Sequence, residues 1–338
     1  MRKTATITIV LLLAGAAYGQ ATTKYKFKQN CTPGNYVITS TNEMDQLTQM
    51  GAGMTMAQKV GLMTVTEMKI GKPAQGGQKV RMAYKRIKQS VTGGPMSMEY
   101  DSAAPAEEQS SMLAPVVGAM LDSEVSFTVA PDGTVSKVSG MDKMWEKASQ
   151  SQPGAGAMLG SMKEQFGNRM IDQFSGEAKA ILPAKAVGKG DLWLVEADQS
   201  VAGVGKMKMA NDCKLADVKE TAAGKVAVIE FVGTATSDEP PPARSIGPVQ
   251  AKFEQVQVNR SGTVKVDMNS GMVTDADIVQ ASKIVMQMAS PQGQGAPMKM
   301  TILQKGKTVT QLRQGKYIPP TTRPAGEATT KPAKATDS

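Results

Sequence analysis

The stretch FTVAPDGTVSKV (Phe127–Val138) decides the fold, because it predicts two short strands joined by a tight turn. Asp132-Gly133 supplies the turn, since glycine adopts a positive φ readily and aspartate tolerates one nearby. Apolar and polar residues alternate on both sides, which is typical of antiparallel strands with one buried face. The stretch VKVDMNSGMVTDADI (Val264–Ile278) has the same form. These two hairpins, one in each half of the chain, predict a β-rich protein with two related halves.

A further hairpin precedes each of these and supports the division into halves. The first reads TEMKIGKPAQGGQKVRMAY (66–84) and the second reads ADVKETAAGKVAVIEF (216–231). Both alternate apolar and charged residues, turn on glycine and resume the alternation after Lys-Val. The shared order favours a duplicated unit, and the alternative is that glycine turns recur in any β-rich protein.

Two stretches interrupt the simple alternation of the predicted strands. The alternation of Met54–Ile70 changes near Val65, which predicts either a new register or a β-bulge. The strand that begins at Phe253 runs into Asn259-Arg260-Ser261-Gly262. That composition is typical of a turn, so the strand is predicted to end there.

The chain as a whole is predicted to be an α+β protein that is mainly β. Curved antiparallel sheets would come from two pseudo-repeated halves, 20–140 and 183–314, with a helix at about 105–121 in the first. A helical connector is predicted over 141–182, where apolar residues recur at helical spacing. These residues are Met158, Met162, Phe166, Met170 and Phe174. The tail 315–338 is rich in Pro, Thr, Ala and Lys, so it is predicted to be disordered.

The N-terminus has the form of a secretory signal peptide over residues 1–19. Arg2 and Lys3 precede the apolar run Ile7–Ala17, and Ala17-Tyr18-Gly19 provides small residues for cleavage. The run is shorter than the about 20 apolar residues that span a bilayer. The protein is therefore expected to be exported, periplasmic or secreted, and not membrane-spanning after cleavage.

The composition argues against several classes of function. The 338 residues include no histidine, the side chain best suited to proton transfer near neutral pH and the commonest nitrogen ligand for metals. No GxSxG, SxxK or HExxH motif occurs. The sequence therefore predicts a protein that is not an enzyme, with no catalytic, cofactor-binding or metal-binding residues assigned. Aromatic residues make up only 4%, and no dense block of Lys and Arg occurs, which argues against nucleic-acid binding.

One carboxylate pair keeps a hydrolase open as an alternative. Asp275 and Asp277 follow the turn of the second hairpin and are expected to face solvent. The separation that matters for a two-carboxylate site is spatial, so the sequence leaves this alternative undecided.

The two cysteines, Cys31 and Cys213, form a candidate disulfide. An oxidising compartment would allow them to pair. The bond would close a loop of about 180 residues and contribute on the order of 5 kcal/mol in the chain-entropy model. The alternative is two separate thiols, with Cys213 buried in a strand and Cys31 in a turn.

Methionine is abundant, with 25 residues, and forms five Met-x-Met pairs. The pairs are Met54/Met56, Met96/Met98, Met207/Met209, Met286/Met288 and Met298/Met300. On a strand, both members of a pair point to the same face. They fit three interpretations: ordinary core residues, an adaptable lining for a lipid-like ligand, or soft thioether ligands for Cu(I).

Several stretches, taken in order, resemble a family of exported bacterial proteins known only as a domain of unknown function. The resemblance covers most of residues 24–313 and rests on strand ends and turns. The stretches are YKFK (25–28), MTMAQKVGLMTVTEM (54–68), KVRMAYKRIK (79–88), MEYDS (98–102), SFTVAPDGTVSKVSG (126–140), ILPAKAVGKGDLW (181–193) and GTVKVDMNSGMV (262–273). The family carries no assigned activity, so the resemblance implies no functional residues. More remotely, the predicted curved sheet is similar to periplasmic lipoprotein carriers, a likeness of fold alone.

These observations lead to one expected function and two alternatives. The expected function is that of an exported, non-enzymatic envelope protein that holds an apolar or lipid-like ligand in a sheet-lined groove. The alternatives are a Met-based Cu(I)-binding protein and a hydrolase with a carboxylate site. The expected partner is an apolar small molecule or a lipid, with no nucleic acid and no cofactor.

Overall fold

The computed structural model describes residues 23–27, 31–51, 53–94, 97–105, 114–121, 123–130, 134–151, 180–201, 205–222, 224–237, 244–246, 249–288 and 297–319. The predicted signal peptide lies outside the described residues. So do the connector's regularly spaced apolar residues and the tail from residue 320.

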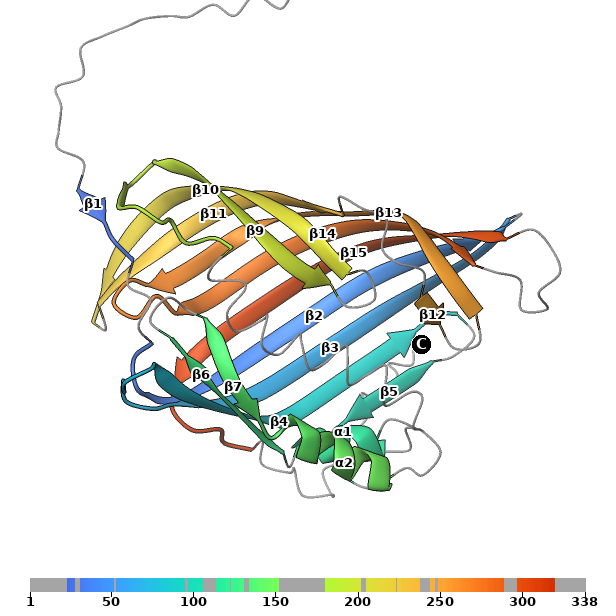
Figure 1. Ribbon diagram of the computed structural model, residues 1–338, viewed down its shortest axis with the longest axis horizontal. Helices are drawn as coiled ribbons and strands as arrows, with labels where there is room; N and C mark the ends of the chain where they lie inside the picture. Colours follow the sequence, from blue (N-terminus) through green and yellow to red (C-terminus); the bar gives the residue numbers. More distant parts are fainter. Residues whose placement is uncertain are drawn as a thin grey trace, which may run out of the picture.

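One antiparallel sheet of thirteen strands dominates the molecule (Figure 1). Its strands are β2 (Gly34–Met50), β3 (Met54–Ile70), β4 (Gln78–Thr92), β5 (Met98–Asp101), β6 (Glu124–Val129), β7 (Val135–Ser139), β9 (Leu192–Val201), β10 (Gly205–Thr221), β11 (Gly224–Thr236), β12 (Arg244–Ile246), β13 (Val249–Asp267), β14 (Val273–Met288) and β15 (Met298–Gln314). Their order is β7-β6-β4-β3-β2-β15-β14-β13-β11-β10-β9, with β5 beside β4 and β12 beside β13. The predicted α+β, mainly β class is therefore confirmed.

The last strand of the chain joins the two halves into a single sheet. β15 pairs with β14 on one side and with β2, near the N-terminus, on the other. Gly306 of β15, for example, lies opposite both Gln280 and Met44. The hydroxyls of Ser40 and Thr310 lie 3.2 Å apart across the β2–β15 junction. An early strand, β2, and the last strand, β15, thus meet in the middle of the sheet.

The hairpins predicted from the sequence are present. β6 and β7 form the first, although the tip of its turn at 131–133 lies outside the described residues. β13 and β14 form the second, where Gly271 has a φ of 71°. Asp267 holds that turn, because its carboxylate accepts hydrogen bonds from the Asn269 amide at 3.0 Å and the Ser270 hydroxyl at 2.6 Å. Turn geometry therefore explains Gly271, as its sequence indicated.

The two irregular stretches had different outcomes. A β-bulge lies beside Val65, where the β3–β4 register shifts between Val65 and Thr66, but its extra residue is Lys85 of β4, and β3 itself pairs with β2 without a shift. The predicted turn at Asn259-Arg260-Ser261-Gly262 is wrong, because β13 continues through it to Asp267. Gly262 instead allows β13 and β14 to approach closely, because a Cβ at this position would meet the carbonyl oxygen of Asp277 on β14. Close backbone approach and a turn both favour glycine, so composition alone could not separate them.

The two faces of the sheet differ, and the side that carries the buried apolar clusters is named here the inner face. Helices α1 (Ala114–Leu121) and α2 (Met141–Ser151) lie beside β4 and β5 (Figure 1) and cover one end of it. Met120 and Trp145 pack there against Ile87 and Tyr100. Of the helix predicted at 105–121, the structure describes α1, while 106–113 lie outside the described residues. Helix α2 begins where the predicted helical connector over 141–182 begins.

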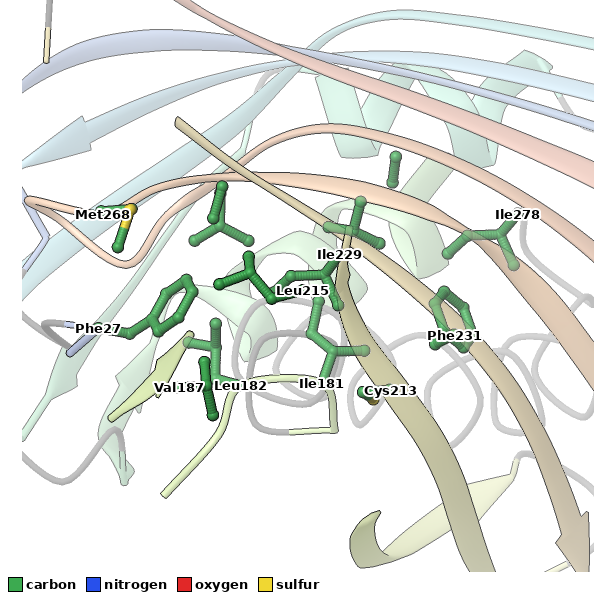
Figure 2. Packing of buried hydrophobic residues seen from close by; sticks show 14 residues of the cluster. Phe27, Ile181, Leu182, Val187, Cys213, Leu215, Ile229, Phe231, Met268 and Ile278 are labelled. Atoms are coloured by element: carbon green, nitrogen blue, oxygen red, sulfur yellow. The ribbon is translucent and has the colours of Figure 1, made fainter. Parts of the chain in front are cut away.

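A short strap covers the inner face at the β10–β11 end. It consists of the paired strands β1 (Lys24–Tyr25) and β8 (Val187–Gly188), with the segment around Ile181 and Leu182. Figure 2 shows Phe27, Ile181 and Leu215 among the side chains of the cluster beneath it. The Trp193 indole donates a hydrogen bond to the Ile181 carbonyl at 3.0 Å, which fixes the strap to β9.

Candidate functional site

The strand register separates charged side chains from neutral ones. Side chains that alternate along paired strands point to opposite faces, so cross-strand partners share a face. Glu43, Lys59 and Lys305 all point to the outer face, opposite the buried clusters. The outer ion pairs join exposed side chains, as in Lys307–Asp277 at 2.9 Å and Lys59–Asp45 at 3.7 Å. Such pairs contribute little to stability, so this charge serves chiefly to keep the outer face hydrated.

Seven methionines gather on the inner face near one end of the sheet and form the candidate site, named here the methionine patch. They come from four neighbouring strands, β3, β2, β15 and β14. They are Met50, Met54, Met56, Met286, Met288, Met298 and Met300. Three of the five Met-x-Met pairs therefore converge, although they are far apart in the sequence.

Cross-strand pairing brings four of these methionines into one row. Met286 is the partner of Met300, Met300 is the partner of Met50, and Met50 is the partner of Met54. Directly opposed residues in antiparallel strands have Cβ atoms about 4.5–5.5 Å apart. The four thioethers thus line a continuous band across the sheet.

The methionine patch is open at one side and buried at the other. Met54 is 66% exposed and Met298 is 39% exposed, whereas Met286 is only 4% exposed. On the buried side the patch continues into a cluster that includes Phe253 and Val256 of β13. Met54, at the start of β3, therefore meets solvent, while Met286, three strands away on β14, packs in the core.

The remaining Met-x-Met pairs belong elsewhere. Met207 and Met209 of β10 are buried in the cluster with Phe253, as the core interpretation predicts. Met98 begins β5, and Met96 lies outside the described residues. The core interpretation is thus correct for one pair and incomplete for the pairs that form the methionine patch.

A polar zone follows the methionine patch toward the middle of the inner face. Gln46 and Gln304 join β2 to β15 through an amide hydrogen bond of 3.0 Å, and Ser282 donates to Gln304 at 2.8 Å. Arg260 lies in the same zone on β13, with Nε 3.3 Å from the Asn211 side-chain oxygen. The inner face therefore changes from apolar to hydrogen-bonding along the strands.

The outer face carries a shallow trough of about 860 Å³ that crosses the strands from β4 to β11. Lysines and carboxylates from the centre of the sheet border it, including Glu43, Asp45 and Lys305. Apolar residues such as Val232 and Val279 line it as well, so the trough is a mixed charged and apolar surface.

Asp275 and Asp277, the carboxylates that kept a hydrolase open, point to the outer face. Each one faces a lysine: Asp275 lies 3.9 Å from Lys265, and Asp277 lies 2.9 Å from Lys307. Cross-strand ion pairing accounts for both. Among the described residues, no group of three or more His, Cys, Asp or Glu side chains lies close enough to hold a metal ion.

The two cysteines are free thiols in the structure, so the candidate disulfide is not formed there. Cys213 is buried in the cluster beneath the strap, and this burial raises the pKa of its thiol to about 11. Cys31 is half-buried near Tyr36, and desolvation raises its pKa as well. Neither thiol is activated as a nucleophile, because a raised pKa lowers the thiolate fraction.

Sequence reasoning missed Arg260 as a functional candidate by assigning it to a turn. A signal was present, since Val256, Val258, Arg260 and Val264 share one parity along a single strand. An arginine in an apolar alternation indicates a charge on the buried side of a sheet.

The comparisons with known structures identify remote likenesses only. A structure that concerns lipid–protein interactions in lipovitellin has a TM-score of 0.40 and 10% identity, covering 85% of this chain and 26% of that chain. The outer membrane protein OprG from Pseudomonas aeruginosa has a TM-score of 0.24 and 6% identity, covering 85% of this chain and 100% of that chain. An outer membrane channel from Pseudomonas putida F1 has a TM-score of 0.23 and 6% identity, covering 84% and 98%. This chain thus spans about a quarter of the lipovitellin chain.

Three further observations bear on classification. Among the described residues, no helix combines the length and the apolar content needed to cross a bilayer. A search of curated protein sequences finds no match. Residues 75–273, more than half of the chain, match a family of unknown function (DUF6263). Its matched region runs from the β3–β4 turn to the β13–β14 turn, and the chain belongs to this family.

Proposed function

We propose that the protein is an exported, non-enzymatic protein that binds a lipid-like ligand at the methionine patch. One observation carries the proposal: seven methionines from four adjacent strands form a half-exposed apolar band on the inner face. Unbranched thioether side chains change rotamer easily and adapt to irregular apolar shapes. A ligand with flexible acyl chains suits such a surface.

The dimensions of the methionine patch agree with this ligand class. Four neighbouring strands at about 4.8 Å spacing give a band roughly 14 Å across. Ile284 and Ile302, which pack against the adjoining cluster, extend it along the strands. A band of this width accommodates acyl chains lying side by side.

Substitution of two methionines tests the proposal. The double variant Met54→Gln/Met300→Gln is expected to bind the apolar fluorophore N-phenyl-1-naphthylamine about 10- to 30-fold more weakly than the unaltered protein. Loss of each thioether would remove roughly 1 kcal/mol of apolar contact with the ligand. Fluorescence titration measures the dissociation constant. Native mass spectrometry after incubation with phosphatidylglycerol vesicles shows whether lipid is retained.

The matched control is Met63→Gln, which changes a half-exposed methionine of the same strand β3 on the outer face. It is expected to leave binding of the fluorophore unchanged. Equal weakening by the control and the double variant would refute a site on the inner face, as would a lipid-free mass after vesicle incubation.

A second candidate function, Cu(I) binding, has one observation in its favour: the row Met286, Met300, Met50 and Met54 places soft thioethers beside one another. Anaerobic Cu(I) titration against the chelator bicinchoninate tests it. If the protein binds Cu(I), it is expected to compete with the chelator with a dissociation constant well below micromolar. The variant Met50→Leu is then expected to lose this affinity. Micromolar or weaker binding would eliminate the candidate.

A further inference from the structure

We propose that the ligand is an uncharged acyl ester that carries hydroxyl groups, such as a monoacylglycerol, and that Gln46 and Gln304 bind its head group. This inference rests on the proposed function, because it places the acyl chain of the same ligand on the methionine patch. It adds the chemical class of the head group, its position on the inner face and the two residues that recognise it.

A chain of hydrogen bonds crosses three strands beside the methionine patch. The Ser282 hydroxyl of β14 donates to the Gln304 side-chain oxygen of β15 at 2.8 Å, and the Gln304 nitrogen donates to the Gln46 oxygen of β2 at 3.0 Å. The Gln46 nitrogen donates in turn to the Thr48 hydroxyl at 3.3 Å. Ser282 and Thr48, at the two ends of the chain, are buried, whereas the two glutamines are half-buried. The two amides are therefore held in fixed orientations on an accessible part of the inner face.

Each of these amides keeps hydrogen-bonding capacity for a ligand. A side-chain amide has two N–H donors and an oxygen with two lone pairs. Among the hydrogen bonds of the described residues, the nitrogens of Gln46 and Gln304 donate one bond each, and their oxygens accept one each. One N–H and one lone pair per amide remain, which suit an ester carbonyl and a hydroxyl. Gln58 of β3, the cross-strand partner of Gln46, extends the row with a third amide.

The surroundings of the two amides favour an uncharged head group. At the described positions of β2, β3, β14 and β15, every residue that points to the inner face is uncharged. Arg260 lies two strands from Gln304, on β13, and its guanidinium contacts the Asn211 oxygen and the Phe231 ring. A charge moved from water onto such a surface loses hydration that neutral amides replace only in part. An uncharged ester avoids this cost and still forms hydrogen bonds with the amides.

The distance from the amides to the methionine patch matches an acyl chain. On β15, Gln304 is four residues from Met300 and six from Met298, and all three point to the inner face. At about 3.4 Å per residue, these separations are roughly 14 and 20 Å. The acyl layer of one bilayer leaflet is about 15 Å deep. A head group at Gln304 thus places the acyl chain along Ile302 and its end on the methionine patch.

Competition between matched amphiphiles tests the proposal in the full-length protein. Monolauroylglycerol provides the uncharged head group, laurate an anionic one and dodecyltrimethylammonium a cationic one, all on chains of the same length. Each is titrated against bound N-phenyl-1-naphthylamine at about pH 8, where laurate is ionised. The unaltered protein is expected to bind monolauroylglycerol about tenfold more tightly than either ion, because each ion binds through its chain alone and loses hydration of its charge.

Two variants separate recognition from folding. Methionine keeps the unbranched shape of glutamine and removes its amide, so Gln46→Met/Gln304→Met is expected to reduce the preference for monolauroylglycerol to about twofold or less. Binding of the two ions stays within about twofold of the unaltered protein. The single variant Gln304→Met, which retains the bond from Gln46 to Thr48, is expected to leave a preference of about threefold. The matched control Gln49→Met changes an exposed glutamine of the same strand β2 on the outer face and leaves the preference unchanged.

The outcomes also distinguish the two levels of inference. If the variants weaken all three amphiphiles equally, the amides serve only to join the strands, and the proposal is overturned. If the unaltered protein binds either ion as tightly as monolauroylglycerol, the head-group assignment is refuted and the lipid-like ligand stands. If none of the amphiphiles displaces the fluorophore, the proposed function fails, and the head-group assignment fails with it.

Discussion

Leu215→Ala is expected to lower the free energy of unfolding by about 2–5 kcal/mol, the range measured for leucine-to-alanine changes in protein cores. Leu215 is 0% exposed in the cluster beneath the strap and has Ile229 as its partner on β11. Removing its side chain leaves a cavity between the strap and the sheet, and packed neighbours fill such a cavity only in part. Urea titration followed by tryptophan fluorescence measures the change, since Trp193 packs against the same cluster.

Leu192→Ala provides the matched control on the neighbouring strand β9. Leu192 is 77% exposed on the outer face, so the same chemical change is expected to cost less than about 0.5 kcal/mol. The difference between the two variants thus reports burial alone. Similar destabilisation by both would contradict the assignment of the inner and outer faces at this edge of the sheet.

Gly262→Ala is expected to destabilise the protein by about 1–3 kcal/mol, the usual cost of overpacking. The new Cβ would meet backbone atoms of β14, the carbonyl oxygen of Asp277 and the Cα atom of Ile278. Backbone cannot rotate away as a flexible side chain can, so β13 and β14 would have to separate. Thermal unfolding monitored by circular dichroism measures the loss.

The control for this prediction is Gly118→Ala in helix α1. A Cβ there meets nothing within 4 Å, and alanine favours a helix over glycine by about 0.5–1 kcal/mol. This variant is expected to be neutral or slightly stabilising. A neutral Gly262→Ala would instead restore the interpretation of residues 259–262 as a turn.

Hairpins and their turns were predictable because both are local. The β13–β14 turn follows from Asp267 and Gly271, whose roles depend on residues within the turn. The changed alternation along β3 indicated an irregularity near Val65, but only the pairing with β4 shows that the extra residue of the bulge is Lys85. The prediction of a turn at residues 259–262 is wrong because Gly262 allows close approach of the β14 backbone, and β14 is a different part of the chain.

The candidate site was less predictable. Sequence spacing showed that Met298 and Met300 share a face, but not that Met286 and Met50 are the neighbours of Met300 on either side. That arrangement depends on β15 lying between β14 and β2, strands from opposite ends of the chain. The sequence predicts an apolar surface lined by methionine. The order of the strands determines which Met-x-Met pairs form it.

The sequence by itself determined the β-rich class, the positions of the main turns and the alternation that places charge on one side of each strand. These features depend on φ preferences and on a repeat of two residues, both of which act over short distances. Only the tertiary structure decided which strands are neighbours, and therefore which methionines converge and where Arg260 lies relative to them. Strand order depends on the closure of one sheet across some 270 residues, and no local pattern specifies that pairing.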